Sequence, residues 1–189
     1  AHKSNMPRGW QWPPSPAMTA QAERCKEGLS DESISFRKAR KKQKIAAPIT
    51  VPSMRFGELR LVPTFRKGPF PMDCHLALAL GRASAALEEA GVKELRFSSI
   101  YSYRRAITGG VEKKSLSRHA LGLAVDVYEV RDSSGVVHVV EDSYADSEFL
   151  KAVEDALNDT GLFRLVLSPK NDPASHSDHF HLEARVDYL

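Results

Sequence analysis

A valine-rich segment at residues 121–130 carries a single aspartate, Asp126, in its middle. Its β-branched residues predict a strand, in which successive side chains point to opposite faces of a sheet. One face then holds Ala124, Asp126 and Tyr128, and the other holds Leu123, Val125 and Val127. A carboxylate inside a sheet is costly unless a partner compensates for its burial. The fold must therefore supply a partner for Asp126.

Two kinds of partner would satisfy Asp126. His119 lies on the preceding turn, close enough in sequence to share a metal ion with Asp126. Gly122 permits an unusual backbone at that turn, and the small side chain of Ala124 leaves room beside a metal. In the alternative, local backbone groups hydrogen-bond to Asp126, and His119 is simply exposed.

A second polar cluster near the C-terminus favours the metal. The segment 176–183 reads His-Ser-Asp-His-Phe-His-Leu-Glu and holds three of the seven histidines. Strand alternation places His179, His181 and Glu183 on one face, so two imidazoles point the same way. Zinc prefers imidazole nitrogen and carboxylate oxygen, and catalytic sites combine three protein ligands with water. His119, Asp126 and His181 would supply that set.

The remaining pattern predicts an α+β fold. Apolar residues at helical spacing predict a helix at 73–90, preceded by Pro71 and followed by Gly91. Ser147 is expected to cap a second helix that ends at Gly161. Strands are expected at 93–101, 121–130, 135–140, 162–167 and 180–186. We expect one domain at 21–189, with helices flanking a largely antiparallel sheet.

The N-terminal residues 1–20 are proline-rich and contain both tryptophans, Trp10 and Trp12. Proline fixes φ and removes backbone donors, so these residues predict an extended strap; a proline-rich recognition motif is the alternative. The basic run at 37–44 is interpreted as a solvated loop, because no aromatic side chains interleave to stack on bases. We therefore expect no nucleic-acid partner.

Composition and cysteine content bear on where in the cell the protein works. No run of about eighteen apolar residues exists, so no membrane span is expected. The first ten residues lack an apolar signal core. The two cysteines, Cys25 and Cys74, would form one disulfide in an exported protein, whereas the same count means little in a cytosolic one.

The two histidine-containing segments resemble motifs of known protein families. The segment 117–126, Ser-x-His-x-x-Gly-x-Ala-x-Asp, followed by His179-x-His181, is similar to the pattern of the LAS zinc peptidases. These include D-Ala-D-Ala carboxypeptidases and murein endopeptidases. A closer resemblance is to the bacterial extensin-like C-terminal family, carried by residues 101–104, 117–120 and 176–182 and extending over roughly 25–185. At one position the chain departs from that family: Tyr103 stands where the family has a cysteine, which leaves Cys25 as the sole possible partner of Cys74.

The resemblance implies an LAS-peptidase-like core and a role for each polar side chain. His119, Asp126 and His181 would bind zinc. His179 would be the general base or would stabilise the transition state, and His176 would be a further catalytic histidine. Asp178 is a less favoured base, because alternation turns it to the other face; orienting a ligand imidazole suits it better.

Two residues outside the histidine clusters complete the expected site. Arg104 matches the position where carboxypeptidase-type relatives hold a terminal carboxylate, with Arg105 as an equal geometric candidate. Ser117 is expected to hydrogen-bond near the metal rather than act as the nucleophile.

The function that these features predict is zinc-dependent hydrolysis of an amide bond in bacterial peptidoglycan peptides. An endopeptidase is favoured over a carboxypeptidase, because Gly109 and Gly110 indicate a mobile loop that could admit crosslinked substrate. The alternatives are a non-catalytic wall-binding module with a structural zinc, and a zinc-dependent sensor or chaperone-like protein. We expect a monomer that works in the periplasm or after secretion.

Overall fold

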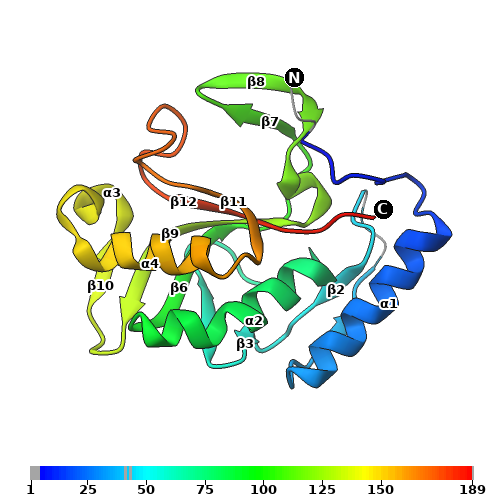
Figure 1. Ribbon diagram of the computed structural model, residues 1–189, viewed down its shortest axis with the longest axis horizontal. Helices are drawn as coiled ribbons and strands as arrows, with labels where there is room; N and C mark the ends of the chain where they lie inside the picture. Colours follow the sequence, from blue (N-terminus) through cyan, green and yellow to red (C-terminus); the bar gives the residue numbers. More distant parts are fainter. Residues whose placement is uncertain (1–4, 41, 43, 189) are drawn as a thin grey trace.

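The computed structural model describes residues 5–40, 42 and 44–188, in which helices and a mostly antiparallel sheet combine into an α+β fold. Its main sheet has the strand order β11-β12-β9-β6-β4-β3, and β10 pairs with β9 beyond the end of β12. Neighbouring strands are antiparallel except for β4 and β6, which run parallel. The helices α1, α2 and α4 lie on one side of this sheet, and the β7–β8 hairpin rises from the other (Figure 1). The fold class predicted from the sequence is confirmed.

The elements follow in chain order. The helices are α1 (Pro16–Asp31), α2 (Cys74–Glu89), α3 (Val140–Ser143) and α4 (Glu148–Asp159), with 3-10 turns η1 (Arg118–Leu121) and η2 (Tyr144–Asp146). The strands of the main sheet are β3 (Arg55–Phe56), β4 (Leu59–Pro63), β6 (Val92–Ser99), β9 (Ala124–Asp132), β10 (Val137–Val139), β11 (Phe163–Leu167) and β12 (Phe180–Ala184). A small sheet holds β1 (Arg37–Lys38), β2 (Pro48–Thr50) and β5 (Met72–Asp73), and a hairpin holds β7 (Arg105–Thr108) and β8 (Val111–Leu116).

The two predicted helices are confirmed, and so is the predicted cap of α4, Ser147. Asp73 is the N-cap of α2, where its side chain accepts from the backbone N–H of His75. Ser147 caps α4 in the same way, through the N–H of Leu150. Such caps satisfy donors that the first helical turn cannot pair internally. The apolar stripe of each helix packs on the sheet, with Leu76, Leu80, Val153 and Leu157 almost fully buried.

Helix α1 was not expected, because its residues lie partly in the predicted strap. The helix begins at Pro16, so the extended part of the N-terminus is shorter than the predicted range 1–20, whose first four residues lie outside the described part. Ser15 accepts from the N–H of Met18, and proline at the first helical position needs no donor. Ser15 followed by Pro16 is therefore a helix-start signal that the prediction of a strap overlooked.

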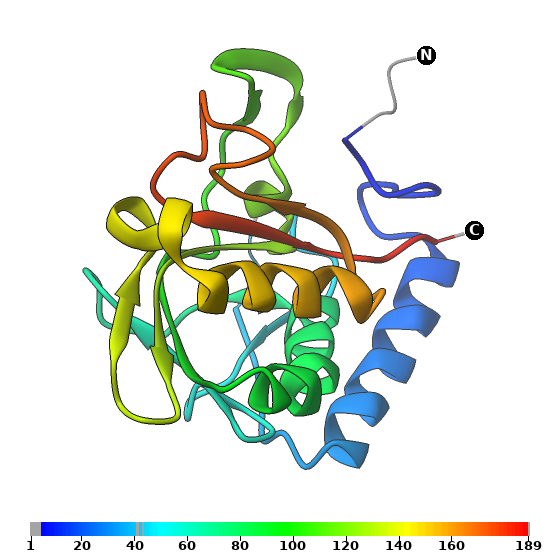
Figure 2. The same cartoon turned by 60° about the vertical axis from the view of Figure 1, so that its left-hand side comes forward.

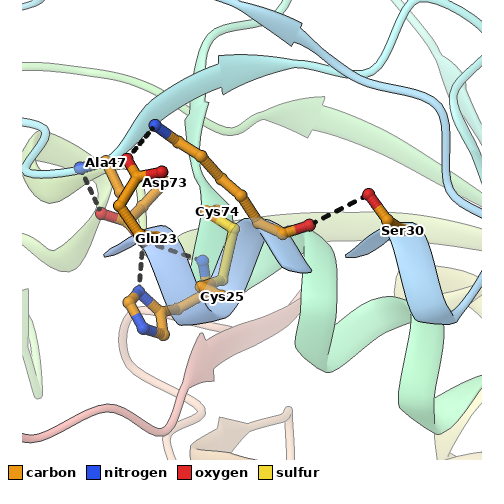
Figure 3. Close-up of a disulfide and its surroundings, with 8 residues drawn as sticks. Glu23, Cys25, Ser30, Ala47, Asp73 and Cys74 are labelled. Atoms are coloured by element: carbon orange, nitrogen blue, oxygen red, sulfur yellow. Dashed lines mark hydrogen bonds and ion pairs between the residues drawn. A yellow bond between two sulfur atoms is a disulfide. The ribbon is translucent and has the colours of Figure 1, made fainter. Parts of the chain in front are cut away.

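The disulfide between Cys25 and Cys74 ties α1 to the first residue of α2, and the prediction is confirmed. Both cysteines are buried, and their Cα atoms are 6.1 Å apart. Figure 3 shows the bridge beside Asp73, whose carboxylate also accepts from the N–H of Ala47. Disulfide and cap therefore hold α1, α2 and the small sheet together.

The segment before α1 lies beside the end of the chain. Arg8 pairs with Asp187, and its carbonyl accepts from the N–H of Tyr188. Lys44 lies over the ring of Trp12, 5.2 Å from its centroid. Within the basic run, Arg37 and Lys38 are exposed as predicted, although they form the short strand β1 rather than a loop; Lys41 and Gln43 lie outside the described residues. None of the helices in the described part of the chain is both long and apolar enough to cross a membrane.

Candidate metal centre

Asp126 lies on β9, directly opposite His181 on β12. Its Oδ1 atom is 2.9 Å from His181 Nδ1 and 3.1 Å from His119 Nε2. All three side chains are buried, and His119 has no exposed surface. The alternative in which His119 is exposed is therefore wrong.

The chain reaches this arrangement through a tight turn before β9. Ser117 caps η1 by accepting from the N–H of His119, 3.2 Å away. Gly122 then adopts a left-handed backbone (φ 68°), and a Cβ atom there would lie 2.8 Å from the backbone N of Asp73. This turn carries the chain from His119 into β9, so the strand starts at Ala124 rather than at residue 121 as predicted. The predicted face of Asp126 is nevertheless correct.

The ring of His119 is fixed by a carbonyl on its far side. Its Nδ1 donates to the carbonyl of Ile100, 2.8 Å away, at the end of β6. A carbonyl can only accept, so Nδ1 carries the hydrogen and Nε2 is the atom left for a metal. Metal-bound histidines usually have such a partner for their other nitrogen.

His181 has a carboxylate at each ring nitrogen. Nδ1 faces Asp126, and Nε2 lies 3.0 Å from Oε1 of Glu183, which also pairs with Arg164. Burial opposes a charge on this ring, but the two carboxylates outweigh it and raise the pKa of His181 to about 9. Burial likewise disfavours the charged form of Asp126, yet His119 and His181 hold the pKa of its carboxyl well below the usual value.

His179 lies at the edge of this group, just before β12. Its Nδ1 donates to Asp178, 2.6 Å away, and its Nε2 is 3.6 Å from Oδ1 of Asp126. The ring stacks on Tyr128, with centroids 4.8 Å apart. Asp178 therefore orients His179. The prediction that it would orient a ligand imidazole is wrong. The Nε2 atom of His179 faces Asp126.

His176 is held by Asp172 and connects the site to the β7–β8 hairpin. Its Nδ1 donates to Oδ2 of Asp172, 2.9 Å away, and burial lowers the pKa of His176. The hairpin turn is Gly109-Gly110, both with positive φ, which is the two-residue turn typical of hairpins. Gly110 donates to Ser175 (2.7 Å). The predicted mobile loop is instead a hairpin tip fastened to the loop that carries His176, and Figure 2 shows the two side by side.

These side chains line a cavity of about 430 Å³ between the hairpin, β9 and the end of β12. Asp126, His176, His179 and His181 all line it, whereas His119 contacts Asp126 without lining the cavity. Arg104 also lines the cavity but is exposed, and its guanidinium contacts the carbonyl of Arg105 at 3.4 Å. Arg105 instead approaches Glu112 on the hairpin. Of the two candidate arginines, the structure therefore brings Arg104 to the site.

His119, Asp126 and His181 fit a metal ion. Each offers one ligand atom, and these atoms lie within 4.8 Å of one another. Nitrogen and carboxylate donors in this ratio suit zinc and other first-row metals. Ile100 and Glu183 hold the far sides of the two imidazoles, as expected around a metal.

Several site residues were not predicted. Glu183 and Tyr128 were placed on the correct sheet faces, but their contacts were not predicted: Glu183 reaches His181 along the same strand, and Tyr128 meets His179 through the pairing of β9 with β12. Asp172 and Asn5 were missed altogether. Asn5 lines the cavity because its side chain donates to the carbonyl of Leu116, 111 residues away. No local pattern reveals such a contact.

A buried His–Asp–His group at the floor of a cavity, in an α+β domain, defines a protein that could bind a metal ion. The chain belongs to the family described as extensin-like protein C-terminus, whose model matches residues 23–188. No curated protein and no solved structure matches the chain.

Proposed function

We propose that the protein is a zinc-dependent hydrolase that cleaves an amide bond in peptidoglycan peptides. The observation that carries this proposal is the set of three candidate ligands beside a cavity, with a third histidine, His179, next to them. The motif resemblance to LAS peptidases supports the same chemistry and the same substrate class.

The number of ligands favours catalysis over a structural metal. Structural zinc sites are almost always closed by four protein ligands, whereas catalytic sites keep one position open. The group contains three residues, and His176 is held by Asp172 instead of joining them. This arrangement argues against the second candidate, a wall-binding module in which His176 would complete the metal shell.

Zinc in such a site would polarise the scissile carbonyl and lower the pKa of a ligand water towards ~7. We assign the role of proton acceptor to His179; this is supported by Asp178, which accepts from Nδ1–H and so leaves Nε2 facing Asp126. Tyr128 keeps the ring in that plane by stacking. Glu183 and Ile100 hold the two candidate ligand imidazoles in place, so these rings need not become ordered when substrate binds.

The substrate would lie in the cavity between the β7–β8 hairpin and the loop that carries His176. Its volume of about 430 Å³ is in the range of small-ligand sites and would hold a short peptide. Of the two peptidase types, we favour an endopeptidase. Arg104, the candidate for a terminal carboxylate, is exposed rather than fixed in a buried fork.

The disulfide supports a location outside the cytosol, since such bridges persist in oxidising compartments. We therefore propose that the protein acts in the periplasm or after secretion, and as a monomer.

Incubation of the purified protein with isolated peptidoglycan sacculi, followed by mass spectrometry of released peptides, tests the function. We expect new peptide termini that disappear when zinc is chelated and return when it is restored. Binding to sacculi without any new termini would instead support the wall-binding module. If the protein neither bound nor cleaved sacculi, the peptidoglycan proposal would be wrong.

A further inference from the structure

A second cavity lies on the other side of Arg118 from the metal centre. It measures about 540 Å³ and is lined by the four arginines Arg8, Arg118, Arg164 and Arg185, together with Asp187 and two apolar residues. These arginines come from the N-terminal segment, η1, β11 and the end of β12. Among the described residues, Arg118 is the one shared with the metal cavity.

The cavity has an excess of positive charge. Arg8 is compensated by Asp187, 3.1 Å away, and Arg164 is paired with Glu183. Arg118 and Arg185 instead donate to neutral carbonyls, those of Asn5 at 2.5 Å and Gly161 at 2.9 Å. Within the described part of the chain, neither Arg118 nor Arg185 forms a direct ion pair, although the charges of Glu183 and Asp187 act on Arg118 from farther away.

Arg118 is the more unusual of the two. Its side chain is 2% exposed, and its Nη1 has no hydrogen-bond partner within the described part of the chain. A buried donor without a partner is costly, and such groups are rare in native proteins. Burial lowers the pKa of Arg118 to about 10, so the group is still charged at neutral pH. A buried guanidinium that stays charged and leaves one nitrogen without a hydrogen-bond partner indicates a ligand that neutralises it.

We propose that the arginine-lined cavity binds an oxyanion with two negative charges, of the class of inorganic phosphate or a terminal phosphomonoester. A phosphomonoester carries about −1.5 to −2 charges at pH 7, which matches the two arginines that lack a direct ion pair. Guanidinium groups bind phosphate oxygens with paired N–H donors. Arginines that approach from four separate segments surround a tetrahedral ion better than a planar carboxylate, which one guanidinium fork can satisfy.

Phosphate binding is measured on the full chain by calorimetry at constant ionic strength, with arginine Nε–Hε NMR signals as the residue-specific readout. We expect saturable binding at about one site per chain, with shifts of the Arg118 and Arg185 signals. Phenyl phosphate tests the monoester source, and malonate tests a dicarboxylate of equal charge. Weaker binding of malonate than of phosphate is expected, and the reverse order would overturn the phosphate class.

Two variants and two controls assign the site. Arg185→Gln and Arg118→Gln should each weaken phosphate binding by about tenfold or more, since each removes a charge-assisted contact. Arg185 is exposed, so its variant serves even if Arg118→Gln does not fold. Arg24→Gln removes the same charge from an exposed position on α1 and should change nothing. Equal losses in Arg24→Gln and Arg185→Gln would show non-specific attraction and end the proposal.

Phosphate binding does not depend on hydrolysis. His119→Ala, which removes a metal ligand, should leave phosphate affinity unchanged. If phosphate binding disappears with the metal, the anion binds at the metal centre and not among the arginines. An inactive protein that still binds phosphate would refute the proposed hydrolase but not this site.

Discussion

Asp126 and His181 lie opposite each other on neighbouring antiparallel strands, and Oδ1 of Asp126 is 2.9 Å from Nδ1 of His181. The same oxygen is within 3.1 Å of His119 Nε2 and 3.6 Å of His179 Nε2. One buried carboxylate oxygen thus lies close to three imidazole rings. This geometry is too costly to keep for packing alone, because nearby apolar side chains would fill the space more cheaply.

The purified protein should hold about one zinc ion per chain, because the three ligands define one mononuclear site. His119→Ala and Asp126→Ala should each abolish stoichiometric zinc, as measured by elemental analysis. His138→Ala is the matched control, because His138 bonds Asp132 on the β9–β10 hairpin, away from the cavity. Full zinc retention in either ligand variant would remove that residue from the proposed site.

The histidines at positions 179 and 181 should behave differently. His179→Ala should keep the metal and lose about 10²–10⁴-fold in kcat, since a proton-transfer group is removed. His181→Ala should lose both zinc and turnover. Asp178→Asn should keep zinc and slow the reaction less, because it disturbs only the orientation of His179. If His179→Ala lost zinc and His181→Ala kept it, the two roles would have to be exchanged.

Zinc affinity should depend on pH because of His181. Without metal its pKa is raised to about 9, so the ring is protonated at pH 7 and must lose that proton to become a ligand. Apparent affinity should therefore rise by roughly tenfold per pH unit from 7 towards 9, and proton competition should weaken binding as pH falls. Chelator competition at several pH values measures the slope, and calorimetry in two buffers measures about one released proton. An affinity that is flat between pH 7 and 8.5 would contradict the protonated state of His181.

Local patterns predicted the parts of the site that belong to single strands. Alternation placed Asp126 and His181 on the correct faces, because the side-chain period of a strand is two whatever its neighbours are. The capping residue Ser147 likewise marked the start of α4. The sheet register, which sets Asp126 opposite His181, brought these correctly oriented residues into contact.

Features that depend on distant contacts could not be predicted in this way. Gly109 and Gly110 indicated mobility, but Asp172 and Ser175 accept from their backbone N–H groups and fix the hairpin tip. Asn5 reaches the cavity only because the N-terminal segment follows the end of the chain. The parallel pairing of β4 with β6 required a crossover through α2, which the pattern of short strands did not reveal.

Removal of the disulfide should destabilise the fold. The double variant Cys25→Ala/Cys74→Ala should lower the free energy of unfolding by about 2–4 kcal/mol, because the bridge closes a loop between residues 49 apart in sequence. Urea denaturation followed by circular dichroism measures the change, and mass mapping without reductant verifies the linkage in the parent protein. Zinc content at low temperature should be unaffected, since α1 does not contribute a ligand. An unchanged unfolding midpoint, or free thiols in oxidised parent protein, would count against a stabilising bridge.

Substitution of Arg104 distinguishes an endopeptidase from a carboxypeptidase. An endopeptidase acting within crosslinks has little need for a terminal-carboxylate contact, so Arg104→Ala should change kcat/KM by less than about threefold on crosslinked peptides. Free and C-terminally amidated peptide stems should then react at similar rates. In a carboxypeptidase the lost charge-assisted pair would cost ~1.5–3 kcal/mol, or roughly ten- to a hundredfold in kcat/KM on free stems. Arg105→Ala is the control. It removes the same charge from the neighbouring position, where the guanidinium approaches Glu112 on the hairpin. A selective loss in Arg104→Ala, together with a preference for free stems, would show that the enzyme trims chain ends and would reverse our preference for an endopeptidase.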